Sequence, residues 1–413
     1  MNGKKYTEIK ECRICGSKNL VSYLDLGDMP LVNRLIVEEE IPKEEKFPLE
    51  VLFCKDCFLS QLSVVVNPSV LFRNYVYRSS ISDSFKKHCK ELAEELNENI
   101  LKKGELVMDI ASNDGCLLVP FKERMNKVLG IDPAINLAKI ANESGIETIP
   151  EFWDESLAKK ILEKYGPAKI ITAFNVFAHV NDIHSFVKGV KILLSRDGYF
   201  IIEVPHLYNL IRKTEFDTVY HEHLSYILVK PIERLIHQHG MRIAKVKKFD
   251  IHGGSIRLYI ENKDKLDTSD GSTQEVIQEE EKSGLYDINT YMNLRKDVDI
   301  LKKNLISKIQ ELKKQGNTIF AFGASAKGNI LLNYCGIDKT SINYIFDDTP
   351  EKQGKLAPGI HIPIIPGKDL LKKKPDYLLL LCWNFAEEVM SKTKDYKEQG
   401  GKYILPVPNL KII

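Results

Sequence analysis

The segment at residues 218–226, TVYHEHLSY, places three ionisable side chains in a row. His221 and His223 flank Glu222, and Tyr220 stands directly before them. Two histidines and a carboxylate can serve as metal ligands, as general acids and bases, or as a buried hydrogen-bond cluster. The segment leaves these interpretations open. It also leaves open which histidine faces a ligand, because residues two apart share one side only on a strand.

Four of the eight cysteines form two Cys-x-x-Cys pairs close to the N-terminus. Each pair places two thiolates on one tight turn, and two such turns make a tetrahedral four-sulfur site that suits Zn²⁺. Four thiolates leave no open coordination position, so we expect a structural zinc site rather than a catalytic one. Free core cysteines and a redox pair are the alternatives. The expected ligands are Cys12, Cys15, Cys54 and Cys57.

Residues 1–75 are the expected zinc-binding domain. The 38 residues between the cysteine pairs (16–53) exceed the usual zinc-ribbon spacing, which predicts an inserted segment. A domain this small builds little core by itself, so the metal is expected to hold it together. The first residues, MNGKKYTEIK, lack the apolar run of a secretion signal, which favours a reduced, cytoplasmic setting.

The middle of the chain alternates between strand and helix patterns. Expected strands lie at 105–111, 127–132, 146–149, 169–174 and 199–204, and expected helices at 83–100, 134–144, 154–165 and 181–194. Such alternation with short connections predicts a doubly wound α/β domain with a parallel sheet, here residues 76–265.

Ligands of such sheets bind at the carboxyl ends of the first strands. The loop DIASNDG (109–115) follows the first strand, and Asp132 ends the second, where a carboxylate can accept ribose hydroxyls. NAD binding normally needs GxGxxG, but here only Gly115 is present, and Ala111 stands where glycine would be expected. S-adenosylmethionine, which has no phosphates, therefore fits better than NAD. An ordinary turn with a surface aspartate is the remaining alternative.

Seven motifs in the same order give the chain a family resemblance. It resembles the sugar C-methyltransferases of deoxysugar biosynthesis, which methylate C3 of nucleotide-linked 4-keto-6-deoxysugars. The motifs are the paired cysteines, YVYRSSISDS (75–84), SNDG (112–115), NVFAHV (175–180), YHEH (220–223), HGGS (252–255) and GASAKGN (323–329). The family loop usually has Glu and Gly where this chain has Asp109 and Ala111, which affects detailed cofactor contacts rather than the assignment.

The resemblance implies three domains: a zinc-binding domain, a class I S-adenosylmethionine methyltransferase core, and a second Rossmann-like domain that helps to hold the nucleotide sugar. The implied cofactor residues are Asp109, Ser112, Asn113, Gly115, Asp132, Pro133 and Asn175. The implied substrate residues are Ser325, Lys327, Asn329, His252 and Ser255.

Eight of the ten histidines fall between residues 179 and 252, which points to a site. Methylating carbon needs a carbanion, and a C–H bond is acidic enough only beside a ketone. A histidine is the natural base near neutral pH, and the enolate oxygen then needs donors. We predict His223 as the base, in agreement with the family. Its predicted helpers are Tyr220 (orienting it or donating to the enolate), Glu222 (fixing a tautomer or holding a sugar hydroxyl), His179 (enolate or substrate contact) and Tyr77 (reaching over the site).

The C-terminal third begins with an apolar stripe at residues 287–315, typical of one packed connecting helix within a connector at 266–315. The run 279–281, three glutamates, is expected on a solvated face. Strands at 318–323, 342–347, 376–382 and 402–407, with a helix at 329–335, predict a second α/β layer over 316–413. Its first strand-to-helix turn carries Ser325 and Lys327 and suits a diphosphate. Asp347 and Asp348 either meet a ribose or cap a turn.

The bulk properties restrict the partners. A net charge of +2 creates no field that favours nucleic acid or an anionic membrane, and no apolar stretch approaches the length of a membrane span. We therefore expect a cytoplasmic monomer that acts on a small nucleotide-linked sugar. Two rivals remain: an NAD-dependent sugar-nucleotide oxidoreductase or epimerase, and a non-catalytic nucleotide-binding module stapled by zinc.

Overall fold

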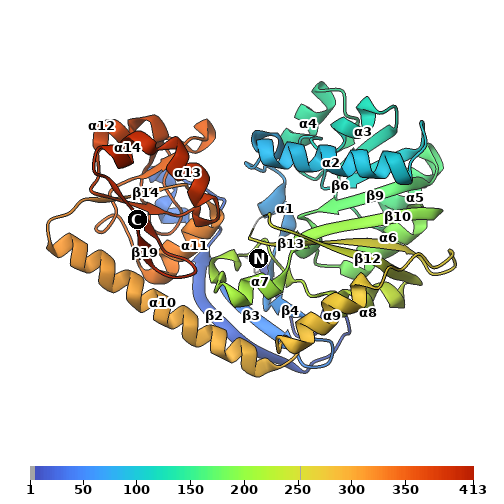
Figure 1. The fold of residues 1–413 in the computed structure, drawn as a ribbon, viewed down its shortest axis with the longest axis horizontal. Coiled ribbons are helices and arrows are strands. Elements are labelled where there is room, and N and C mark those ends of the chain that lie inside the picture. Colours follow the sequence, from blue (N-terminus) through green and yellow to red (C-terminus); the bar gives the residue numbers. More distant parts are fainter. Residues whose placement is uncertain (1–4, 252) are drawn as a thin grey trace.

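The computed structural model describes residues 5–251 and 253–413. Figure 1 shows two α/β units side by side, with an N-terminal sheet and one long helix running along the same side of both. That helix, α10 (Ile288–Lys314), contacts both the N-terminal sheet and the C-terminal unit. The arrangement brings segments from every part of the chain to the space between the two α/β units.

The N-terminal unit is built on a four-stranded antiparallel sheet of order β11-β4-β3-β2. Its edge strand β11 comes from the end of the histidine segment, so this sheet holds that segment directly. The strands are β2 (Leu20–Pro30), β3 (Lys46–Cys54), β4 (Ser60–Leu62) and β11 (Ser225–Tyr226). A separate pair is β1 (Tyr6–Glu8) with β5 (Val64–Val66), and the insertion between the cysteine pairs includes the 3₁₀ helix η1 (Glu38–Lys43).

The middle unit is a seven-stranded sheet of order β12-β13-β10-β9-β6-β7-β8. The strands from β10 to β8 are parallel, whereas β13 runs antiparallel to β10. Every residue of β6 is buried, as expected for a strand covered on both faces. The strands are β6 (Leu106–Ile110), β7 (Lys127–Ile131), β8 (Thr148–Ile149), β9 (Ala168–Phe174), β10 (Leu194–Pro205), β12 (Met241–Phe249) and β13 (Ser255–Asn262).

Helices cover both faces of this sheet (Figure 1). The helices of this part of the chain are α1 (Pro68–Phe72), α2 (Asp83–Asn99), α3 (Val119–Glu123), α4 (Ile135–Glu143), α5 (Glu155–Tyr165), α6 (Ile183–Leu193), α7 (Leu207–Arg212) and α8 (Val229–Gln238). The short 3₁₀ helices are η2 (Ser79–Ile81), η3 (Phe177–His179) and η4 (Phe216–Thr218). The predicted parallel sheet is confirmed, and the hairpin β12–β13 at its edge was not predicted.

The C-terminal unit is a six-stranded sheet of order β16-β15-β14-β17-β18-β19, in which only the edge strand β19 is antiparallel. Its strands are β14 (Ile319–Phe322), β15 (Ile345–Asp347), β16 (Ile364–Pro366), β17 (Tyr377–Leu380), β18 (Lys402–Leu405) and β19 (Lys411–Ile412). Its helices are α11 (Ala326–Cys335), α12 (Leu370–Lys373), α13 (Ala386–Lys392) and α14 (Lys394–Glu398), with η5 (Pro350–Lys352), η6 (Gly367–Asp369) and η7 (Trp383–Phe385).

The connector confirms one prediction and corrects another. The predicted stripe of α10 is buried throughout: Tyr291, Leu294, Val298, Leu301, Leu305, Ile309 and Leu312. The solvated face predicted for the glutamate run is wrong for Glu280, which is fully buried in α9 (Ser272–Lys282). Glu280 shares a helical face with Thr273 and Val276, and it accepts hydrogen bonds from the backbone N–H of Val229 (2.7 Å) and the hydroxyl of Tyr286 (2.6 Å).

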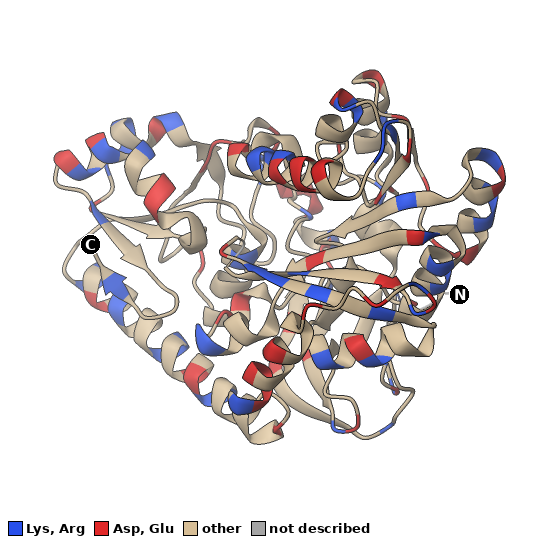
Figure 2. Cartoon of the chain, turned by 45° about the vertical axis from the view of Figure 1, so that its right-hand side comes forward, with Lys and Arg blue, Asp and Glu red and all other residues tan. Residues whose placement is uncertain are grey.

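Acidic and basic residues are both spread over the outer helices in Figure 2, in keeping with the small net charge. Among the described helices, none combines the length and the apolar character required to cross a bilayer.

Candidate active site

The four paired cysteines converge on one point. Cys12 Sγ lies 3.3 Å from Cys57 Sγ, Cys15 Sγ lies 3.6 Å from Cys54 Sγ, and all four sulfurs lie within 4.8 Å of one another. A tetrahedral zinc with bonds of 2.3 Å holds its sulfurs about 3.8 Å apart. The cluster therefore fits Zn²⁺ bound by four thiolates.

The zinc knuckle also touches the histidine segment. The backbone N–H of Arg13 donates to Gln61 (2.9 Å), whose strand β4 pairs with β11. The Arg13 guanidinium donates to the carbonyl of Leu224 (3.0 Å), the residue directly after His223. The metal site thus fixes the backbone next to His223, although its ligands lie elsewhere.

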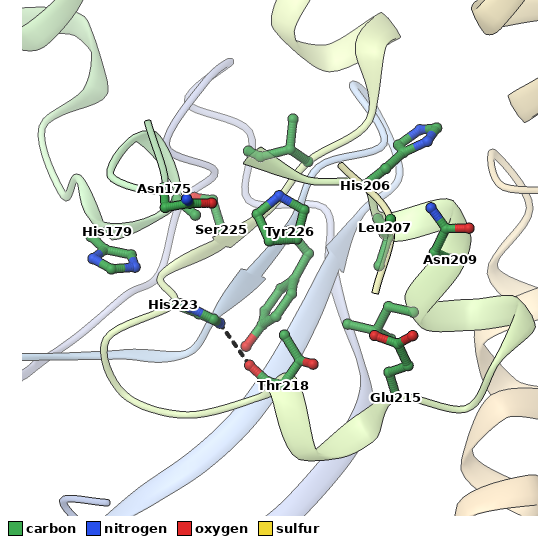
Figure 3. Close-up of a pocket in the computed structure, with 15 residues that line it drawn as sticks. Asn175, His179, His206, Leu207, Asn209, Glu215, Thr218, His223, Ser225 and Tyr226 are labelled. Carbon is green, nitrogen blue, oxygen red and sulfur yellow. Dashed lines mark hydrogen bonds between the residues drawn. The ribbon is translucent and has the colours of Figure 1, made fainter. Parts of the chain in front are cut away.

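A cavity lies where β9 and β10 end. Asn175 follows β9 and lines it together with His179 and His223, and Glu215 and Thr218 line the opposite part (Figure 3). This is the carboxyl edge of the parallel strands, the position at which ligands of doubly wound sheets bind. The cavity is therefore the candidate active site.

His223 has a defined tautomer. Its Nδ1–H donates to the backbone carbonyl of Thr218 at 2.7 Å (Figure 3), which leaves the Nε2 lone pair free. Burial lowers the pKa of His223 well below its usual value, and the nearby His179 and the Lys327 ammonium lower the pKa further. The imidazole is consequently neutral at pH 7 and has the proton acceptor that a base requires.

Aromatic side chains surround this imidazole. The Tyr220 ring lies 3.9 Å from the His223 ring, and the His179 ring lies 5.1 Å away, measured between centroids. His179 also stacks on Phe72 of α1 at 5.6 Å. Burial lowers the pKa of His179 to about 4, so this second histidine is also neutral. Tyr77 is about half exposed, and its carbonyl accepts a hydrogen bond from the Asn113 amide (3.1 Å).

The three ionisable residues of the segment face three directions. His221 is buried against the N-terminal unit, and its Nε2 lies 3.2 Å from the carbonyls of Phe47 and Pro48. Glu222 and His223 likewise have separate partners, and the tautomer of His223 is set by a backbone carbonyl rather than by Glu222. These orientations do not make a shared metal site.

Glu222 is held by two donors. Its Oε1 accepts from the amide of Asn33 (2.7 Å) and its Oε2 from the hydroxyl of Tyr75 (2.8 Å). Burial raises the pKa of Glu222 to about 7, while these two hydrogen bonds oppose the rise. The carboxyl thus titrates close to neutrality.

The predicted cofactor loop has a positive φ at three residues: +58° at Ala111, +54° at Asn113 and +80° at Gly115. A left-handed residue at position 111 explains why glycine is expected there. The N–H of Asn113 donates to Asp132 Oδ2 (2.7 Å), and the N–H of Ala134 donates to Oδ1 (2.8 Å).

Each oxygen of Asp132 keeps a lone pair for a ribose hydroxyl, so the loop fits the nucleoside of S-adenosylmethionine. Pro133 lies between Asp132 and the N–H of Ala134. Asn175 also has a positive φ (+56°) and lines the cavity. Two other predicted residues of this loop are buried: Asp109, which accepts from Thr172 Oγ1 (2.6 Å), and Ser112.

The predicted substrate residues have different surroundings. Ser325 caps α11 by accepting the N–H of Gly328 (3.1 Å), and the buried amide of Asn329 donates to the carbonyl of Val32 (2.7 Å). Ser255 donates to the Ile251 carbonyl (3.2 Å), and His252 lies outside the described residues.

Lys327 lies between the two α/β units. Its Nζ is 3.5 Å from Glu215 Oε2 and 4.7 Å from the centre of the Trp383 ring, and it has no hydrogen-bond partner among the described residues. The Trp383 indole donates to Asp217 (2.6 Å). Of the two alternatives for Asp347, the capping contact is present, because Asp347 accepts the N–H groups of Ala324 (2.7 Å) and Thr349 (2.8 Å).

Several residues at the site were not predicted. Glu215, Asp217 and Trp383 belong to irregular segments without a periodic pattern, and only the packing of two units brings them together. Tyr75 belongs to the YVYRSSISDS motif, so the sequence contained a signal that could have identified it as a site residue. Asn33 lies in the inserted segment between the cysteine pairs, where nothing in the sequence marks it.

Comparisons with known proteins agree with this architecture. Residues 12–72 match a zinc binding domain of methyltransferases, residues 82–246 a methyltransferase domain, and residues 250–408 the C-methyltransferase C-terminal domain. The chain is 35% identical to the C-methyltransferase NovU of Streptomyces niveus over 407 residues, which cover 98% of this chain and 97% of NovU.

Solved structures with partial similarity are also found. One is magnesium protoporphyrin IX methyltransferase from Synechocystis PCC 6803 with bound S-adenosylmethionine (14% identity, 43% of this chain, 79% of that chain, TM-score 0.34). Another is the PH0226 protein from Pyrococcus horikoshii OT3 (15% identity, 47% of this chain, 98% of that chain, TM-score 0.36). On the near full-length match to NovU and the three matched domains, the chain belongs to the S-adenosylmethionine-dependent C-methyltransferases.

Proposed function

We propose that the enzyme methylates a nucleotide-linked 4-keto-6-deoxysugar at a carbon next to the ketone, C3 in our proposal, through an enolate formed by His223. The observation that carries the proposal is the polar lining of the cavity. Four lining residues hold a buried oxygen without a hydrogen-bond partner among the described residues: Glu215 Oε1, Thr218 Oγ1, Ser225 Oγ and Tyr226 Oη. A sugar supplies the hydroxyl groups that such oxygens need.

The chemistry follows from the groups around the cavity. In the proposed reaction, His223 Nε2 takes the proton from the carbon beside the ketone, and the electron pair of that C–H bond moves toward the ketone oxygen. His179 and Tyr220 carry the donors that stabilise this oxygen. When bound on the Asp132 side, S-adenosylmethionine supplies an electrophilic methyl group, whose transfer forms a C–C bond and breaks a C–S bond. His223 retains the proton until it is released to solvent.

The nucleotide part of the substrate has a plausible anchor at Lys327. This ammonium is mostly buried and has no hydrogen-bond partner among the described residues, and it is close enough to His223 to lower the pKa of that imidazole. In the proposal, the diphosphate attached to C1 of the sugar binds this ammonium while the sugar ring reaches His223. One nucleotide sugar could therefore bind the anion site proposed at the start of α11 and the proposed base at the same time.

Mass spectrometry of the purified enzyme with S-adenosylmethionine and a panel of keto sugar nucleotides tests the proposal. We expect one substrate to gain a single methyl group, and NMR then distinguishes C3 from C5, since both carbons lie beside the ketone. In D₂O with S-adenosylhomocysteine, the wild type should exchange the hydrogen at that carbon. Methylation of oxygen or nitrogen, or no methyl gain with any keto sugar nucleotide, contradicts the proposal.

A further inference from the structure

A turn of the N-terminal unit reaches Glu222, the residue directly before His223. The turn at residues 31–34 is closed by a hydrogen bond from Arg34 N–H to the Leu31 carbonyl (3.0 Å). The Asn33 amide at its tip donates to Glu222 Oε1 at 2.7 Å, although the two residues are 189 positions apart in the chain. Glu222 is 4% exposed, so this contact lies in a dry environment.

The same turn is held from the opposite side by the C-terminal unit. The Asn329 side chain, fully buried in α11, donates to the carbonyl of Val32, the residue before Asn33. Three residues after Asn33, Ile36 and Leu356 exchange backbone hydrogen bonds at 2.8 and 3.3 Å. These contacts fix the backbone on both sides of Asn33. The Asn33 side-chain amide is therefore held against the Glu222 carboxylate.

We propose that Asn33 is a positioning residue of the methyl-transfer site, which holds the Glu222 carboxylate in one orientation and favours its ionised form. The inference rests on the proposed function, because it assigns Glu222 a role at the sugar. It extends the role of the zinc-binding unit, which then contributes a side chain to the reaction centre as well as structural support. A donor at 2.7 Å stabilises a carboxylate more than a carboxylic acid.

The surroundings of Glu222 make this effect measurable. Two titratable groups face it: the phenol of Tyr75, which donates to Oε2, and the phenol of Tyr220. Burial raises the pKa of both tyrosines well above 10, so they stay neutral over the working range of pH. Changes at Asn33 should therefore appear as a change in the titration of Glu222 alone.

Two variants distinguish a positioning role of Asn33 from a purely structural role. Asn33→Leu keeps the size but removes the donor, and we expect the acidic limb of kcat to move up by about one pH unit, with kcat roughly fivefold lower at pH 7 and recovering at pH 9. Asn33→Asp adds a like charge and should move the limb further in the same direction. Asn19→Ala is the matched control, because Asn19 donates to an exposed carboxylate, Asp56, in the same unit (3.1 Å).

Infrared difference spectroscopy of the Glu222 carboxyl, assigned with Glu222→Gln, gives a readout that needs no substrate. The pKa of Glu222 should rise in both Asn33 variants and stay unchanged in Asn19→Ala. An unchanged pKa, or a loss of kcat that is equal at every pH, would overturn the inference. Should Asn33→Leu not fold, Asn33→Asp decides. A shifted carboxyl in an enzyme that methylates no keto sugar nucleotide would reject the proposed function and leave the Asn33 contact intact.

Discussion

At the scale of single residues, the histidine segment separates into three tasks. His221 packs against the N-terminal unit, Glu222 is bound by Asn33 and Tyr75, and His223 lines the cavity with its tautomer set by Thr218. The difference comes from backbone turns rather than from side-chain chemistry, since the two imidazoles are chemically the same. A base must reach its substrate, and of the two imidazoles in this segment His223 is the one that lines the cavity.

Replacing His223 by alanine should lower kcat by at least about 10²-fold, the contribution of a general base. The hydrogen–deuterium exchange at the sugar carbon should be lost together with methyl transfer, because both need the same proton removal. His237→Ala is a suitable control, since His237 is exposed at the end of α8. Turnover close to wild type in His223→Ala would reject the assignment of the base.

The pH dependence of the wild type should report Glu222. Since the pKa of Glu222 is raised to about 7 and the pKa of His223 is lowered, His223 is already in its base form when Glu222 ionises. If the ionised carboxylate is needed, kcat rises with pH through about 7 and then levels. Glu222→Gln should remove this limb and lower the plateau, which a pH series of initial rates measures. If kcat still rises with pH through about 7 in Glu222→Gln, another group is responsible for the rise.

At the scale of elements, the edge strand β11 connects the zinc-binding unit to the segment that carries His223. It completes the N-terminal sheet through β4, and the Arg13 guanidinium holds the carbonyl just before it. Its two residues, Ser225 and Tyr226, follow His223 after a single intervening residue. Loss of the zinc knuckle would therefore free the backbone on the C-terminal side of His223, the proposed base, while the proposed cofactor loop on the parallel sheet would keep its own hydrogen bonds.

Removing the metal should consequently affect the two ligands differently. In Cys54→Ser we expect zinc content to fall, methyl transfer to drop more than about tenfold, and affinity for S-adenosylhomocysteine to change little. Metal analysis and isothermal titration measure the two properties independently of activity. Cys382→Ser, which changes a cysteine outside the cluster, should keep its zinc. An equal loss of cofactor affinity would mean that the knuckle supports the whole fold instead.

At the scale of the whole molecule, the sequence predicted parts better than their assembly. The alternating strands and helices of the parallel sheet, the stripe of α10 and the cysteine cluster follow from periodicity and spacing, which are local. Glu280 shows the limit, because a charged residue on a buried face has the same local pattern as one on a solvated face. Asn33 and Trp383 show it again, since their positions depend on contacts across more than 150 residues of sequence.

Lys327 tests whether the C-terminal unit binds the nucleotide. Lys327→Ala should weaken the binding of a nucleoside diphosphate by roughly tenfold, the loss of one charge-assisted contact to a phosphate. Isothermal titration with the diphosphate alone measures this without the sugar. Lys392→Ala removes a lysine that already pairs with Glu388 on the outer helix α13 and should bind normally. Unchanged affinity in Lys327→Ala would remove this lysine from the nucleotide site.

The long helix α10 has a consequence for how such a protein can change. Its 27 residues span about 40 Å without interruption, and its apolar stripe contacts β2 at one part and α11 at another. Inserting one residue between these contacts would rotate the two parts by about 100° relative to each other and shift them by about 1.5 Å. Lys327 would then lose its position beside Glu215. Insertions and deletions should thus be tolerated in surface loops but not in α10. The length of this helix sets the position of the C-terminal unit relative to the N-terminal sheet.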